Sequence, residues 1–74
     1  MWREGKIEVE KKTIHYWMKS FDLESPYGID EGRISKLMLK RDGQIIATFD
    51  RGWDIEPIDA NAQAALKLFM KEYN

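Results

Sequence analysis

Hydrophobic and polar residues alternate near the start of the chain in the way that a half-buried β-strand requires. Within residues 5–10, Ile7 and Val9 fall on one face and charged side chains fall on the other. Residues 13–21 are rich in aromatic and β-branched side chains, which favour strands. The pattern therefore predicts two neighbouring strands early in the chain.

The two residues Lys11 and Lys12 separate these strands and predict a tight hairpin. Neither lysine favours the positive φ angles that a two-residue turn needs, so this turn departs from the usual Asn-Gly type. The expected cross-strand pairs are Val9 with Ile14 and Ile7 with Tyr16. This register gathers apolar side chains on one face of the hairpin.

Residues 33–40 and 44–49 predict a second hairpin around Arg41-Asp42-Gly43. A turn made of Asp42 and Gly43 alone would pair Lys40 with Ile45 and mix the two faces. A three-residue turn with a glycine bulge keeps the apolar residues together, so we expect the bulged turn. The expected pairs are then Leu39 with Ile45 and Leu37 with Ala47, with Phe49 on the same apolar face and Ile46 on the other.

Residues 22–32 predict a long loop, and the end of the chain predicts a helix. Ser25-Pro26-Tyr27-Gly28 has proline and glycine where a β-turn prefers them. After Asp59, apolar residues recur at the spacing of one face of a helix, with Asp59 as the expected N-cap. The apolar stripe consists of Ala62, Ala65, Leu66, Phe69, Met70 and Tyr73.

These elements predict an α+β fold of order β-β-β-β-α. We expect a four-stranded antiparallel sheet, arranged as a meander, with the C-terminal helix packed on one face. The chain has 74 residues, which suits a single small domain over 1–74.

Composition narrows the function classes. The chain has no cysteine, which removes disulfides and thiolate metal sites. No apolar run has the length of a signal peptide or of a membrane span, so we expect a cytoplasmic protein with no membrane partner. The formal net charge of −1 lacks the basic excess that is usual among nucleic-acid-binding domains.

Three stretches carry a family resemblance: "MWREGKIEV", "SPYGIDEGRISKL" and "DRGWDIEP" leading into a helix that ends "KEYN". Together they resemble a family of small uncharacterised proteins, a domain of unknown function, from phages and integrative elements of Gram-positive bacteria. The resemblance implies a mobile-element setting and implies no activity, substrate or catalytic residue.

Catalytic chemistry finds little support in these residues. His15 is the only histidine, and its expected neighbour is Glu8 on the solvent side of the sheet, without a nucleophile. The scattered acids match neither zinc nor calcium-loop spacing. We therefore expect no enzyme, no catalytic residue, no metal and no cofactor.

The solvent face of the sheet is the first candidate binding surface. Its apolar residues Trp17, Met38 and Ile46 predict a patch for weak homodimerisation. An alternative is nucleic-acid binding through an aromatic side chain and lysines on that face, although Glu4, Glu8 and Glu10 offset the charge. The residues of this alternative are Lys6, Trp17, Lys19, Lys36 and Lys40. The leading hypothesis is a non-enzymatic protein-interaction module.

The stretch "DRGWDIEP", residues 50–57, predicts a structural corner between the last strand and the helix. Gly52 is expected to take the backbone angle that lets the chain leave the sheet. Trp53 is expected to cover the end of the core, and Arg51 to pair with a nearby acid or with the 22–31 loop. If a partner site lies here, the expected residues are Tyr27, Arg33, Arg51 and Trp53.

Overall fold

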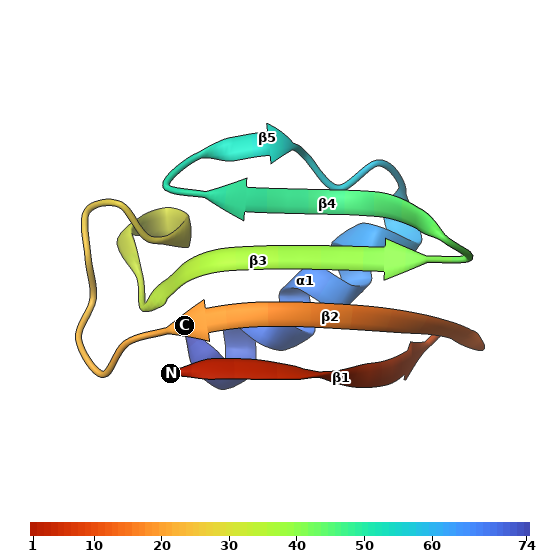
Figure 1. Ribbon diagram of the computed structural model, residues 1–74, viewed down its shortest axis with the longest axis horizontal. Helices are drawn as coiled ribbons and strands as arrows, with labels where there is room; N and C mark the ends of the chain where they lie inside the picture. Colours follow the sequence, from red (N-terminus) through yellow and green to blue (C-terminus); the bar gives the residue numbers. More distant parts are fainter.

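A computed structural model describes all residues, 1–74, as one antiparallel sheet with a single long helix on one side (Figure 1). The strands follow one another in the sheet in chain order, β1-β2-β3-β4-β5. The elements are β1 (Trp2–Val9), β2 (Lys12–Ser20), a short 3-10 helix (Ile29–Glu31), β3 (Ile34–Arg41), β4 (Gln44–Asp50), β5 (Trp53–Ile55) and α1 (Ala60–Tyr73). The α+β class and the meander are confirmed, and the sheet has five strands where the sequence predicted four.

The additional strand, β5, arises from the stretch that the sequence predicted as a corner. The chain reverses at Arg51-Gly52, and Trp53 pairs with Phe49 across the new hairpin. Arg51, and not Gly52, has the positive φ angle, 60°. The Trp53 ring meets the Phe49 ring edge-on at 5.1 Å, so its contact with the core holds the returning segment against β4.

The first hairpin closes one residue earlier than predicted. Glu10 and Lys11 form its turn, with φ angles of 53° and 66°, and Val9 pairs with Lys12. Two positive φ angles give the turn a twist that matches the strands, which outweighs the poor turn preference of these residues. The predicted pairs were wrong: Ile7 faces Ile14 and Gly5 faces Tyr16. Because the shift is two residues, the predicted faces are nevertheless correct.

The second hairpin combines a tight turn with a bulge. Asp42 and Gly43 make the turn, with φ angles of 51° and 77°, and Lys40 pairs with Ile45. One residue farther along, the register shifts so that Leu39 faces Ala47. The predicted three-residue turn was therefore wrong, because the extra residue lies within β4 and not in the turn.

This bulge changes which side chains of β4 reach the core. Ile46 and Ala47, although adjacent, are both 0% exposed, while Ile45 is 37% exposed. The sequence predicted the reverse for the two isoleucines, with Ile45 inside and Ile46 on the solvent face. A strictly alternating strand cannot bury two successive residues, but a bulged strand can.

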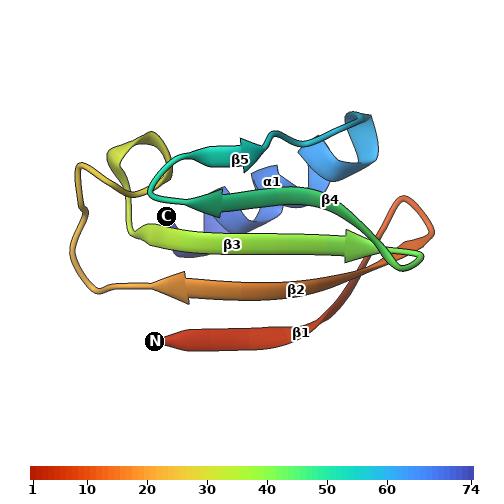
Figure 2. The ribbon, with the colours of Figure 1, turned by 45° about the horizontal axis from the view of Figure 1, so that its top comes forward.

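The helix α1 covers one face of the sheet and closes the core (Figure 2). Asp59 is the N-cap, as predicted, since its side chain accepts a hydrogen bond from the Ala62 N–H. Ala62, Ala65 and Phe69 are buried, and the Phe69 ring lies 4.7 Å from that of Tyr16. The other members of the predicted stripe, Leu66, Met70 and Tyr73, are partly buried against the same core.

The last residue of the chain fixes the long loop. The Asn74 side chain donates to the Ile29 carbonyl and accepts from the Ile34 N–H, both at 3.0 Å. Gly32 lies directly beneath this side chain, and a Cβ there would collide with it. The predicted Ser25–Gly28 turn is confirmed by a 3.0 Å bond from the Gly28 N–H to the Ser25 carbonyl. The loop is thus held at a defined position beside the sheet.

Candidate binding surface

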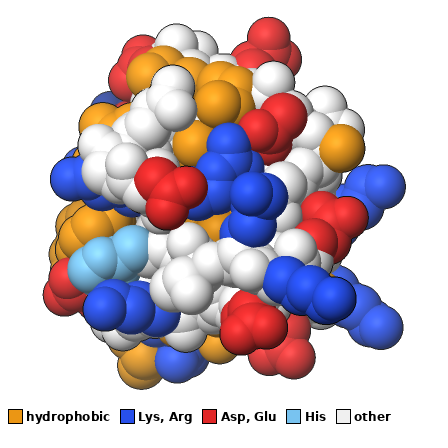
Figure 3. All heavy atoms as spheres, turned by 90° about the vertical axis from the view of Figure 1, so that its right-hand side faces the viewer, with side chains coloured by type: hydrophobic (Ala, Val, Ile, Leu, Met, Phe, Trp, Pro, Cys, Tyr) orange, Lys and Arg blue, Asp and Glu red, His pale blue; other side chains and the backbone are white.

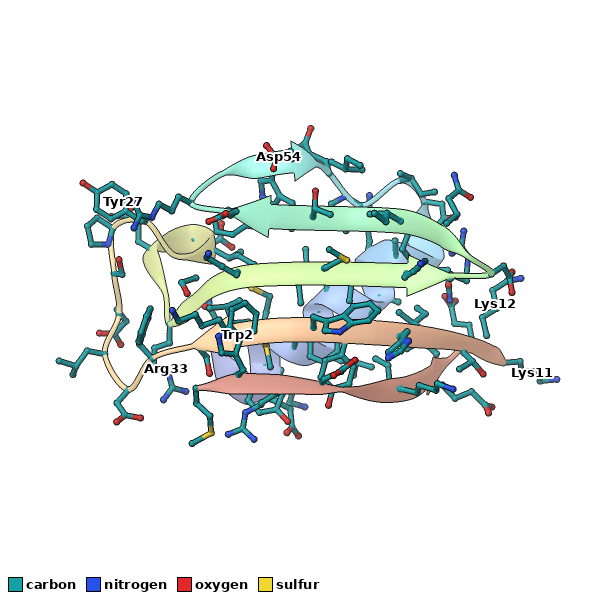
Figure 4. The ribbon with its side chains drawn as sticks, viewed as in Figure 1. Trp2, Lys11, Lys12, Tyr27, Arg33 and Asp54 are labelled. Carbon is teal, nitrogen blue, oxygen red and sulfur yellow. The ribbon has the colours of Figure 1, made fainter.

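The side of the sheet opposite α1 has no covering element, and we call it the open face (Figure 1). It is formed by the even-numbered residues Trp2–Glu8 of β1, the odd-numbered residues Thr13–Lys19 of β2, the even-numbered residues Lys36–Lys40 of β3, and Thr48 and Asp50 of β4. It faces the viewer in Figure 4, where Trp2 marks one end.

The pairing of the strands arranges the open face in cross-strand rows. Trp17 faces Met38 in the central row. One neighbouring row holds Lys6, His15 and Lys40, and the other brings Lys19 opposite Lys36. An apolar centre therefore lies between two basic rows on the middle strands β2 and β3.

Aromatic rings give this surface its shape. The His15 ring stacks on the Trp17 ring, with centroids 4.1 Å apart. Trp2 is 61% exposed, and the Lys19 Nζ lies 5.8 Å from its ring centroid. A groove of about 290 Å³ runs between Trp2 and Trp17 and continues past Met38 to Asp50 and Asp54. The open face can thus take up a narrow chain or a flat ring.

Acidic residues border the basic rows. Glu4 lies 3.6 Å from His15, and Asp50 lies 3.8 Å from Lys36. Seen from the end that carries the two tight turns, basic and acidic side chains are interspersed, with the single histidine at the left edge (Figure 3). The face therefore combines a basic, aromatic middle with a border of mixed charge.

Of the residues predicted for self-association, Trp17 and Met38 lie on the open face and are paired with each other. Ile46 does not, because the β4 bulge turns it into the core. The predicted apolar patch is corrected accordingly. Trp2, which the sequence reading left outside the first strand, takes its place; the alternation that places Glu4 and Lys6 on this face extends back to it.

The residues predicted at the loop end are only partly brought together. The Arg51 guanidinium lies 5.9 Å from the Tyr27 ring centroid, which links the long loop to the β4–β5 turn. This contact with a ring replaces the expected ion pair of Arg51. Trp53 is half-buried against Phe49, and the Arg33 carbonyl accepts from the Phe21 N–H. Figure 4 shows Tyr27 beyond the end of the sheet, away from Trp2.

The strongest polar cluster lies on the helix side and was not predicted. Arg41 binds both carboxylate oxygens of Asp59, at 3.2 and 2.7 Å, and donates to Asn61 at 2.8 Å. Asn61 in turn donates to the Val9 carbonyl at 2.9 Å. The hydrogen bonds from Arg41 and from the Ala62 N–H lower the pKa of Asp59 to about 2. The same pairing raises the pKa of Arg41.

This cluster joins three distant segments. It connects the end of β3, the start of α1 and the β1–β2 turn. Sequence identified Asp59 as a cap but gave no signal for Arg41 or Asn61, since their positions depend on the tertiary packing. These polar groups form hydrogen bonds with one another, so the cluster has a structural role.

The structure has no group of three or more His, Asp or Glu side chains placed to hold a metal ion. Its helix is not long and apolar enough to cross a bilayer.

No curated protein and no solved structure is detectably similar to this chain. One family model, described as "Domain of unknown function (DUF7678)", matches residues 1–74. The chain therefore belongs to this uncharacterised family.

Proposed function

We propose that the domain is a non-enzymatic protein-interaction module whose open face binds an acidic, partly apolar segment of another protein. The observation that carries the proposal is the Trp17–Met38 pair lying between two basic rows. The setting that we propose, from the sequence resemblance, is a phage or an integrative element of a Gram-positive bacterium.

The composition of the open face supports a protein partner. Interface cores are enriched in tryptophan and methionine, and tryptophan is frequent among the residues that carry binding energy. Trp2, Trp17 and Met38 provide such a core along the groove. The surrounding acids and lysines correspond to a polar rim, which contributes selectivity and association rate more than affinity.

The spacing of the rows suggests the form of the partner segment. Side chains two residues apart on a strand are about 7 Å apart, so the two basic rows lie roughly 13 Å apart. An extended segment with acidic residues four positions apart and an apolar residue midway matches this spacing. The apolar side chain contacts Trp17 while the acids reach the rows of Lys40 and Lys36.

Single-stranded nucleic acid is the second candidate. The His15–Trp17 stack beside lysines is a suitable platform for a base. Against it, Glu4 and Asp50 border the same lysine rows, and phosphate binding depends on an excess of positive charge. We therefore rank it below a protein partner.

The experiment titrates the protein with a synthetic peptide of pattern Glu-x-Leu-x-Glu and, separately, with oligo-dT. Binding is monitored by changes in the NMR chemical shifts of the protein. We expect the peptide to shift the signals of the open face. Trp17→Ala and Lys40→Glu should each weaken binding at least tenfold. Lys67→Glu, the same charge reversal on the exposed side of α1, is the matched control and should bind normally.

The outcomes separate the candidates. Preferential binding of oligo-dT that declines steeply with salt would replace the protein partner by nucleic acid. Peptide binding that survives Trp17→Ala but is lost in Arg51→Ala would move the site to the group proposed from sequence: Tyr27, Arg33, Arg51 and Trp53. Absence of binding by either ligand would reject the open face as a site for extended anionic chains.

A further inference from the structure

The strand β1 leaves one edge of the sheet free along its whole length. It pairs with β2 on one side and has no neighbour on the other. Met1 and Ser20 form two hydrogen bonds with each other. The Met1 amino group donates to the Ser20 carbonyl (2.7 Å), and the Ser20 N–H donates to the Met1 carbonyl (3.0 Å). Bonded and non-bonded pairs alternate in an antiparallel ladder, so the odd-numbered residues of β1 bond to β2. The N–H and C=O groups of Trp2, Glu4, Lys6 and Glu8 therefore point away from the sheet.

This edge lacks several of the features that usually prevent pairing. The strand Trp2–Val9 contains no proline, and its register with β2 has no bulge. The charges that β1 presents on the open face alternate in sign: Glu4, Lys6, Glu8. A run of lysines would repel a second identical edge, whereas alternating charges can match one.

We propose that a second copy of the chain pairs antiparallel with β1, with Gly5 facing Gly5 across the two-fold axis. Glu4 of each copy then lies opposite Lys6 of the other. The free backbone groups of both edges are the ones that meet in this register, so they bond to each other along the strand.

Neighbouring registers are less favourable. If the two-fold axis passes through Glu4 and not Gly5, Glu4 of one copy lies opposite Glu4 of the other. If it passes through Lys6, Lys6 lies opposite Lys6, and Glu4 lies opposite Glu8. Like charges directly opposite each other destabilise a strand pair, so the charge pattern favours the register centred on Gly5.

The helix side of the edge also fits a second copy. A groove of about 220 Å³ lies there between β1 and α1, lined by Ile7, Tyr16, Leu68, Phe69, Glu72 and Tyr73. In the proposed register, Arg3 of the second copy faces Ile7 at this groove. In each copy the Arg3 guanidinium lies 4.8 Å from the Tyr73 ring centroid, so the Arg3 alkyl stem adds to the apolar surface that meets there, which includes Leu68, 48% exposed. The open-face side of the edge thus provides charge complementarity, and the helix side provides apolar contact.

The test uses two charge-reversal variants, alone and mixed with each other, and measures their molecular mass by sedimentation. Wild type should dimerise with rising concentration. Glu4→Lys places lysines opposite lysines, and Lys6→Glu places glutamates opposite glutamates, so each variant alone should dissociate at least tenfold more readily. An equimolar mixture of the two restores opposite charges and should form a heterodimer. Glu8→Lys is the matched control, because Glu8 faces Trp2 in this register and no like-charge pair is created.

Amide exchange provides a second readout at the edge itself. The N–H groups of Trp2, Glu4, Lys6 and Glu8 should become protected as concentration rises, while those of Arg3 and Ile7 are protected throughout. Melting temperatures near wild type would show that the variants fold. A wild-type chain that is monomeric at millimolar concentration would overturn the proposal and leave the edge for a strand from a different protein.

The edge dimer and the open-face site can be tested separately. Trp17→Ala should leave the dimer intact, because Trp17 lies on β2 and not at the edge. A dimer that persists in both single reversals and is lost in Trp17→Ala would instead mean that the copies associate through the open face, and the proposed register would be wrong.

Discussion

At the scale of single residues, the Arg41–Asp59 pair provides a prediction for acid stability. The pKa of Asp59 in the fold is about 2, below its ordinary value near 3.8, because Arg41 and the Ala62 N–H bond to the carboxylate. A lowered pKa stabilises the folded state at pH values above the unfolded pKa, and this contribution is lost as pH falls toward the folded pKa. Asp59→Asn should therefore melt at a lower temperature than wild type at pH 7, and the difference should shrink between about pH 4 and pH 2.

The same measurement has an internal control. Asp54 lies exposed on β5, where no hydrogen bond or ion pair engages its side chain, so Asp54→Asn should change the melting temperature little at any pH in this range. If the deficit of Asp59→Asn stayed constant from pH 7 to pH 2, the carboxylate charge would not be the source of its effect.

At the scale of elements, the first hairpin predicts a stabilising substitution. Lys11 has a φ angle of 66°, which costs a side-chain-bearing residue about 1–2 kcal/mol, while glycine loses roughly 0.5–1 kcal/mol of backbone freedom. Lys11→Gly should thus increase the free energy of unfolding by up to about 1 kcal/mol, which corresponds to a rise in melting temperature of roughly 4 °C. Thermal unfolding followed by circular dichroism measures it.

A substitution at Lys12 distinguishes the Glu10-Lys11 turn from the Lys11-Lys12 turn. Lys12 pairs with Val9 within β2, so Lys12→Gly should lower the melting temperature, since glycine weakens a strand. A stabilising Lys12→Gly would instead indicate the Lys11-Lys12 turn that the sequence pattern suggested.

The helix and the strands show how much of the fold the sequence predicts. Alternation and the helical stripe identified the long strands, their faces in the first hairpin, and the N-cap Asp59. The positions of Glu10 and Ile46 could not be predicted, because the turn and the bulge are selected by strand twist and by packing across the whole sheet. Local residue preferences at those positions pointed the other way.

The candidate binding surface was predictable to a similar extent. The lysines and Trp17 of the solvent face follow from alternation alone, and the structure places them on the open face. Trp2 was missed because strand β1 begins before the first clear alternation, and Ile46 was misplaced by the bulge. The row arrangement required the register, which depends on contacts between strands.

At the scale of the whole molecule, the order of the strands has a consequence for folding kinetics. Because every strand pairs with its neighbour in the chain, the hairpins β1–β2, β3–β4 and β4–β5 can each form by closing a short turn before the rest of the sheet is present, and only β2–β3 pairing closes the longer connection over residues 21–33. Chains with such local pairing fold faster than sheets built from distant segments, so we expect a main phase on the order of milliseconds in stopped-flow refolding. Isomerisation of Pro26 and Pro57 in the unfolded chain adds a minor slow phase, which is avoided by refolding the chain shortly after it has been unfolded. A main phase lasting seconds under those conditions would contradict the expectation. The docking of α1, through Arg41 and Asn61 at its start and through Asn74 at its end, brings together segments far apart in the chain. Variants of Arg41 and Asn61 should therefore chiefly accelerate unfolding while leaving the folding rate almost unchanged.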